Sequence, residues 1–105
     1  MKKILLFCCA GMSTSLLVTR MEAEAEKRGL DVKIWACSEK VFPEEFANEP
    51  ADCVLVGPQI RYLLNTLKKQ AGDTPVELID MRIYGMMDGA KVLDMGLAAI
   101  EKAGK

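Results

Sequence analysis

Two short, almost uninterrupted apolar runs constrain the fold of this 105-residue chain more than any other feature. The first is KILLFCC at 3–9, and the second is ADCVLVG at 51–57. Apolar runs of this length, without alternation, are typical of strands that are buried on both faces of a parallel sheet. The chain is long enough for one core and too short for two. We therefore expect a single domain, residues 1–105, built around these strands.

Amphipathic segments separate the apolar runs. An alternating stretch at 31–37 suits an edge strand, and a fourth strand is expected at 74–80. Apolar residues at helical spacing, with glycine or proline near the segment ends, predict helices at 13–28, 38–48, 58–71 and 88–105. Four strands that alternate with four helices predict an open α/β fold, in which right-handed crossovers place helices on both faces of a parallel sheet.

Composition and charge exclude several classes of protein. Fourteen Lys and Arg residues against fifteen Asp and Glu give a net charge of −1, whereas a nucleic-acid binder would carry a basic patch. No apolar run approaches the roughly 20 residues that span a bilayer, and the first run is too short for a signal peptide. We therefore expect a cytoplasmic protein with no nucleic-acid partner and no membrane insertion.

The four cysteines are Cys8, Cys9, Cys37 and Cys53. Structural disulfides are rare in the cytoplasm, so none is expected. The chain has no CxxC spacing and no histidine, which argues against a zinc site, and nothing indicates a cofactor. Cys37 and Cys53 lie in strand-like segments, where we expect them to pack in the core.

Cys8 and Cys9 lie where the first strand ends and a helix is about to begin. Ligands of open parallel sheets bind at this end of the strands, and backbone N–H groups at a helix N-terminus attract anions. The same field favours a thiolate and should lower the cysteine pKa below about 8.5. The plainer alternative is a buried cysteine followed by a Ser-Thr-Ser helix cap. The combined pattern predicts a P-loop-like phosphate site after the first strand, with the loop residues Cys9, Ala10, Gly11, Met12, Ser13, Thr14 and Ser15.

A phosphatase or arsenate-reductase-like cysteine enzyme is the first alternative. A phosphatase of the phosphotyrosine type needs an arginine six positions after its cysteine, to clamp the phosphoryl oxygens. That position holds Thr14 counting from Cys8, and Ser15 counting from Cys9. Asp80 and Asp88 are candidate general acids for such an enzyme, although Asp88 precedes glycine as a helix cap would. The missing arginine suits phosphoryl transfer better than hydrolysis.

A redox or regulatory module that uses the Cys8/Cys9 pair is the second alternative. Adjacent thiols in one loop are open to oxidation, so this class of protein is not excluded by the motif alone. Mass spectrometry after mild oxidation separates it from a phosphocarrier.

The segments LFCCAGMSTSLLV, VLVGPQIRYLL, PVELID and YGMMDG resemble the lactose/cellobiose-type enzyme IIB of the bacterial sugar phosphotransferase system (PTS) over essentially the whole chain. The resemblance implies the strand order 2-1-3-4 and phosphorylation of Cys8, with Cys9 at a variable position. It implies that phosphohistidine of enzyme IIA is the donor and that membrane-bound enzyme IIC holds the accepting sugar. The donor imidazole then belongs to the partner, which is consistent with a chain that lacks histidine. Cellobiose, chitobiose, lactose and related β-linked disaccharides all remain open as the sugar.

The stretch MRIYGMMDG, 81–89, is too apolar for a plain solvated loop. We expect about half of its large side chains to pack beneath the last helix and the others to form an adaptable surface for two unlike partners. The residues proposed for this partner surface are Met12, Gln59, Tyr84, Met86 and Met87. Gln59 is also expected to approach the phosphate loop. A carrier that meets one partner at a time is expected to work as a monomer.

Overall fold

Four strands pair in parallel in the order β2-β1-β3-β4, as the family resemblance implies. The computed structural model describes residues 1–7, 11–38 and 42–104, and for 11–14, 42 and 45 it describes the backbone alone. Strand β1 pairs with β2 on one side and with β3 on the other. The strands are β1 (Lys2–Phe7), β2 (Val32–Cys37), β3 (Cys53–Val56) and β4 (Val76–Leu78).

The helical segments follow the expected order with two additions. They are α1 (Gly11–Lys27), α2 (Phe42–Asn48), the 3-10 helix η1 (Pro58–Leu63), α3 (Leu64–Ala71), α4 (Met81–Gly85) and α5 (Gly89–Lys102). One helix was expected over 58–71, but the segment forms the 3-10 helix η1 followed by α3, and the backbone of Ile60 within η1 is non-helical. A loop was expected before the last helix, yet α4 forms there because the Asp80 side chain accepts hydrogen bonds from the N–H groups of Arg82 and Ile83.

Helix α1 also begins earlier than the expected start at Ser13. Its first residue is Gly11, so 13–15 lie inside the helix and not at the position that precedes it. The alternative in which Ser-Thr-Ser serves only as the cap of this helix is therefore wrong, because an N-cap residue precedes the first helical residue.

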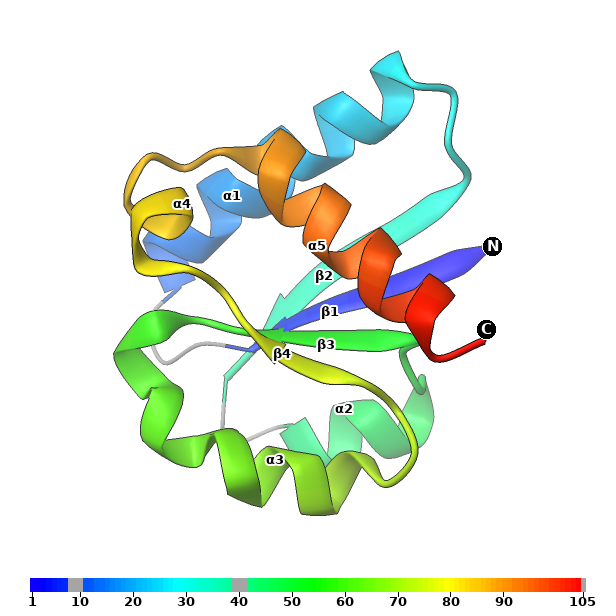
Figure 1. Ribbon diagram of the computed structural model, residues 1–105, viewed down its shortest axis with the longest axis vertical. Coiled ribbons are helices and arrows are strands. Elements are labelled where there is room, and N and C mark those ends of the chain that lie inside the picture. The colour runs from blue at the N-terminus through cyan, green and yellow to red at the C-terminus, as the bar shows by residue number, and fades with distance from the viewer. Residues whose placement is uncertain (8–10, 39–41, 105) are drawn as a thin grey trace.

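Helices cover both faces of the sheet, with α1 and α5 on one side and α2 and α3 on the other (Figure 1). Strand β1 contributes to both cores, because successive side chains of a strand point to opposite faces. Ile4 and Leu6 pack with α1 and α5, while Leu5 and Phe7 pack with η1 and α3. All four side chains are at most 2% exposed, which confirms β1 as a central strand.

Strand β2 lies at one edge of the sheet, as its alternating sequence predicts. Ile34 and Cys37 are buried, whereas Ala36 is exposed. Trp35 is half-buried, and the Lys33 ammonium lies 5.2 Å from the centroid of its ring. The β2 edge is therefore shielded in part by a long cationic side chain on an aromatic face.

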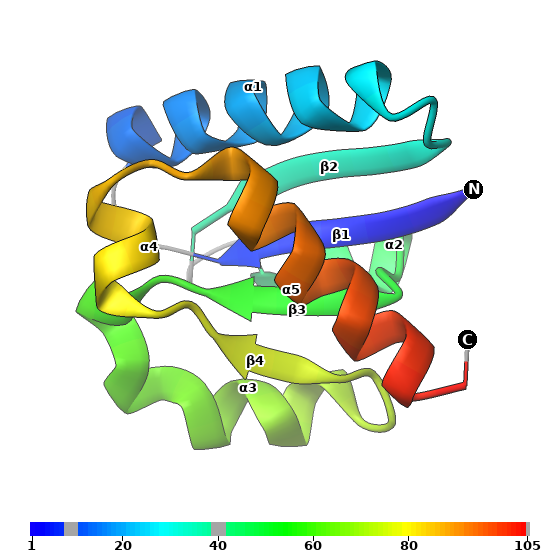
Figure 2. The ribbon, with the colours of Figure 1, turned by 45° about the horizontal axis from the view of Figure 1, so that its top comes forward.

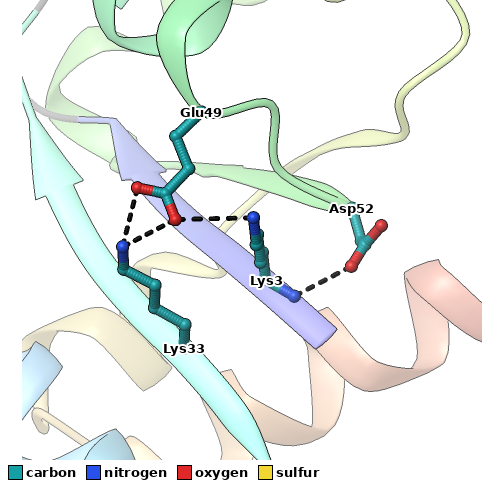
Figure 3. Close-up of polar contacts among 4 residues, drawn as sticks. All are labelled: Lys3, Lys33, Glu49 and Asp52. Carbon is teal, nitrogen blue, oxygen red and sulfur yellow. Dashed lines mark hydrogen bonds and ion pairs between the residues drawn. The ribbon is translucent and has the colours of Figure 1, made fainter. Parts of the chain in front are cut away.

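A polar cluster joins three strands where they begin (Figure 3). The Glu49 carboxylate accepts hydrogen bonds from the Lys33 ammonium at 2.6 Å and lies 3.5 Å from the Lys3 ammonium. The backbone N–H of Lys3 donates to the Asp52 carboxylate at 2.9 Å. The hydrogen bond from Lys33 is the main cause that lowers the pKa of Glu49. These contacts fix the register of β1 against β2 and β3 at the end of the sheet opposite α4.

Helices α1 and α5 pack closely through a glycine. A Cβ atom added at Gly89 would lie 2.7 Å from the Arg20 carbonyl carbon and 2.8 Å from the Met21 nitrogen. Farther along both helices, the Arg28 guanidinium bonds Glu24 and Asp94 at 2.6 Å each. Within the described ranges, every helix is too short or too polar to span a lipid bilayer.

Replacing Gly89 by alanine is expected to destabilise the fold. The new methyl group meets backbone atoms of α1, which cannot rotate away as a side chain can, so α5 must shift. We expect Gly89→Ala to lower the free energy of unfolding in urea by about 1–3 kcal/mol. Gly85→Ala is the matched control, because a Cβ at Gly85 meets nothing within 4 Å. Equal stability of the two variants would contradict this account of the α1–α5 contact.

Candidate functional site

The candidate site lies where β1 ends and α1 begins. Strand β1 ends at Phe7 and α1 starts at Gly11, so a short connection joins the two elements. Cys8, Cys9 and Ala10 form this connection and lie outside the described residues, as do the side chains of 11–14. The elements on either side of the cysteine pair are described and fix where the connection attaches.

The N-terminus of α1 is suited to hold an anion. The first N–H groups of any α-helix lack partners within the helix, and in α1 these include the N–H groups of 11–13. Helix α1 runs for 17 residues and has no acidic side chain in its first turn. The positive end of its dipole is therefore not neutralised by a carboxylate within that turn. A phosphate group at this point would be held by backbone N–H groups rather than by a charged side chain.

The end of β3 lies beside the end of β1. The Gly57 N–H donates a hydrogen bond to the Phe7 carbonyl at 3.0 Å, and η1 starts at the next residue, Pro58. Because β2 and β3 lie on opposite sides of β1, the order of the strands reverses between β1 and β3. Open α/β sheets bind ligands at such a reversal, beyond the carboxyl ends of the strands. Gln59 is exposed at this edge, and its approach to the phosphate loop stays a prediction.

A mostly apolar hollow of about 220 Å³ opens at the same end of the sheet. It is lined by Pro58, Gln59, Met81, Tyr84 and Gly85. Figure 2 shows α4 and the start of α1 together at the end toward which the strands point, opposite both chain termini. The hollow therefore lies on the face of the molecule that also carries the candidate phosphate site.

The 81–89 stretch divides between core and surface, as expected. Met81 is 66% exposed and Met86 is 61% exposed, whereas Ile83 and Met87 are half-buried against the core. Tyr84 was expected on the partner surface. This expectation is wrong, because the Tyr84 side chain is only 6% exposed. Tyr84 packs in the core that α1 and α5 cover, and only its edge lines the hollow.

Asp80 and Asp88 serve as helix caps. Asp80 Oδ1 accepts from the N–H of Arg82 at 2.8 Å, and Asp88 Oδ1 accepts from the N–H of Lys91 at 3.1 Å. The expected capping role of Asp88 is confirmed. Neither the Asp80 cap of α4 nor the exposure of Met81 was predicted from the sequence. The usable signal was an aspartate before Met-Arg-Ile-Tyr, a segment that can form one helical turn.

The two described cysteines are buried, as predicted. Cys53 is 0% exposed, and burial raises the pKa of its thiol to about 12. A thiol with so high a pKa is a poor nucleophile near neutral pH. The part of the chain that the structure describes holds no group of three or more His, Cys, Asp or Glu side chains arranged to bind a metal ion.

These features define a class: a parallel α/β domain in which a helix N-terminus suited to an anion lies at the reversal of strand order. The family model described as "PTS system, Lactose/Cellobiose specific IIB subunit" matches residues 3–95. The chain belongs to this family.

Two relatives are similar along nearly their whole length. The "PTS system oligo-beta-mannoside-specific EIIB component" of Bacillus subtilis (strain 168) is 46% identical over 100 residues, which cover 93% of this chain and 95% of the relative. The solution structure of a cellobiose-specific phosphotransferase IIB component from Borrelia burgdorferi is 36% identical, with a TM-score of 0.79. That comparison covers 97% of this chain and 94% of the Borrelia chain.

A low molecular weight protein tyrosine phosphatase from Bacillus subtilis shares the fold alone. Its structure gives a TM-score of 0.53 at 16% identity and covers 97% of this chain and 99% of that chain. Membership of the IIB family makes this chain a phosphotransferase of the sugar PTS, which moves a phosphoryl group from enzyme IIA to a sugar. Components of this kind work with enzyme IIA and the membrane component IIC.

Cys53 is expected to resist alkylation in the folded protein. Its pKa is raised from 9.0 to about 12. Between these pH values the Cys53 thiol keeps its proton in the folded chain and has lost it in the unfolded chain. The stability that depends on this thiol is therefore present below pH 9 and is lost as the pH rises toward 12. We expect iodoacetamide at about pH 8.5 to spare Cys53 until urea unfolds the chain.

Cys53→Val is the control for the pH dependence, because it keeps an apolar side chain and removes the ionisable group. The stability of the wild-type protein should fall more steeply between pH 9 and 12 than that of the variant. Rapid labelling of Cys53 without urea, or parallel pH profiles, would contradict the burial argument.

Proposed function

We propose that Cys8 carries the phosphoryl group as a phosphocysteine. In the first step the Cys8 thiolate attacks the phosphorus of phosphohistidine on enzyme IIA. An S–P bond forms, the N–P bond breaks, and the imidazole leaves with its electron pair. In the second step a hydroxyl of the sugar bound to enzyme IIC attacks phosphorus. The S–P bond breaks, and the Cys8 thiolate is regenerated. The hydroxyl proton passes to solvent or to a base of the partner.

The single observation that carries this proposal is the position of α1. The helix begins at Gly11, directly after the connection that holds Cys8, and its first turn has no carboxylate. The N–H groups there stabilise negative charge on sulfur before transfer and on the phosphoryl oxygens during transfer. Catalysis then depends on positioning and electrostatics, as is usual for phosphoryl transfer.

Residues Cys9–Ser15 are the proposed phosphate loop. Cys9 and Ala10 precede the helix, and Gly11–Ser13 supply N–H groups that have no partner inside it. We assign the phosphoryl group to Cys8 because it aligns with the acceptor of the IIB family.

The partner surface is proposed to surround the hollow beside α4. Exposed Met81 and Met86, with Gln59, give an adaptable apolar rim that suits two unlike proteins in turn. Met12, whose side chain is not described, is proposed to extend this surface from the phosphate loop. Met87 contributes from its half-buried position. A carrier that meets enzyme IIA and enzyme IIC in turn needs only one accessible copy of this face. We therefore propose that the protein works as a monomer, in the cytoplasm.

The sugar is proposed to be a β-linked disaccharide such as cellobiose, chitobiose or lactose. Cellobiose, named for the Borrelia relative, is a β-linked disaccharide, and the oligo-β-mannoside named for the Bacillus relative is a β-linked oligosaccharide. In this mechanism enzyme IIC recognises the sugar, so the IIB domain contacts only the hydroxyl that accepts the phosphoryl group.

Serine variants of the adjacent cysteines test the assignment. Cys9→Ser keeps both the acceptor thiol and the loop N–H groups, so phosphorylation by phospho-enzyme IIA should persist. Cys8→Ser replaces the thiolate by a hydroxyl of far higher pKa, so transfer at neutral pH should fall by at least about a hundredfold. Intact-protein mass spectrometry measures the phosphate on each variant. A reversed pattern, with Cys9→Ser inactive and Cys8→Ser active, would assign the chemistry to Cys9.

A phosphatase is the alternative function, because a tyrosine phosphatase has the same fold. The clamp position holds Thr14, not arginine, so the transition state of hydrolysis lacks its main cation. We expect negligible hydrolysis of a chromogenic phosphate monoester by the purified chain. Turnover at the rate of a true phosphatase would overturn the carrier proposal.

A further inference from the structure

One side chain of α1 reaches across to the segment that follows α4. The Arg20 guanidinium donates a hydrogen bond to the Met87 carbonyl at 3.0 Å and a longer one to the Met86 carbonyl at 3.5 Å. These residues are 66 and 67 positions away in the sequence. Arg20 therefore links the helix that begins at the phosphate loop to the segment that carries the partner surface.

The segment held by Arg20 has an unusual backbone. Met87 has a φ angle of 52°, which makes it the one non-glycine residue with positive φ in the described part of the chain. A residue with a side chain rarely adopts this conformation unless its surroundings hold it there. The Met87 carbonyl accepts from Arg20 and also from the N–H of Gly89 at 3.0 Å, and the Met87 N–H donates to the Tyr84 carbonyl at 3.0 Å.

The contact is not needed to hold α1 against α5. Gly89 already allows the two backbones to meet, and Arg28 bonds Asp94 of α5 at 2.6 Å. What Arg20 adds is a restraint on the Met86–Met87 turn itself. Met86, which is 61% exposed, directly follows α4, and α4 lies at the same end of the molecule as the start of α1 (Figure 2).

We propose that Arg20 is a positioning residue for phosphoryl transfer. It holds the Met81–Met87 segment at a fixed place relative to the start of α1, so that the docking side chains of this segment meet enzyme IIA together. This inference rests on the proposed function, in which that segment is part of the docking surface and Cys8 is the acceptor. A misplacement of docking side chains weakens the encounter with the donor without altering the thiolate.

The test compares three variants of the full chain: Arg20→Gln, Arg20→Lys and the matched control Arg28→Gln. Initial rates of phosphorylation are measured against the concentration of phospho-enzyme IIA. We expect Arg20→Gln to raise KM for the donor about fivefold and to change kcat by less than about twofold. Arg20→Lys should recover most of the affinity, because an ammonium can still donate to the Met87 carbonyl. Arg28→Gln should lower the urea midpoint and leave KM unchanged.

Two results would overturn the positioning role. The first is a KM for Arg20→Gln equal to that of Arg28→Gln. The second is a slower alkylation of Cys8 by iodoacetamide in Arg20→Gln, which would mean that Arg20 acts on the thiolate and not on docking. Failure of the proposed function is seen separately, because peptide mapping of the phosphorylated wild-type chain would then find the phosphate on a residue other than Cys8.

Discussion

The burial of β1 on both faces is the constraint on which the rest of the structure depends. Ile4 and Leu6 need an apolar cover on one side of the sheet, and Leu5 and Phe7 need one on the other. Helices on both faces and strands on both edges of β1 meet that need, which only crossover connections allow. The carboxyl end of β1 then opens at the reversal of strand order, beside the start of the helix that follows. The packing of the core thus sets the position of the candidate phosphate site.

In the proposed mechanism, backbone groups stabilise the charge, and this separates phosphoryl transfer from hydrolysis on a shared fold. A tyrosine phosphatase has a similar fold at 16% identity, so the sheet and helices alone do not determine the reaction. Thr14 at the clamp position leaves the helix N-terminus as the main source of positive charge. A thiophosphate held in this way stays available for the next acceptor. The far end of the sheet, fixed by Glu49 and the two lysines, is polar and separate from this chemistry.

Patterns of apolar residues predicted all four strands, the central place of β1 and the edge place of β2, because burial of each face determines strand sequence directly. The order 2-1-3-4 came from the family resemblance, since local patterns do not specify which strands pair. The helix α4 was missed because its five residues are too few to show helical periodicity, and its start depends on the single cap Asp80. The burial of Tyr84 depends on packing against distant elements. The Arg20 contact spans 67 positions, so no local pattern contains it.

The central claim is that a phosphoryl group on Cys8 is held by the N–H groups at the start of α1. The most direct measurement is nuclear magnetic resonance of the chain before and after phosphorylation by phospho-enzyme IIA, with ³¹P for the bond type and ¹⁵N–¹H spectra for its surroundings. The account predicts a thiophosphate resonance, with the largest amide shift changes at 9–15 and smaller ones at Gly57 and Gln59. A phosphoramidate or oxygen-ester resonance, or largest changes around Lys3 and Glu49, would contradict it.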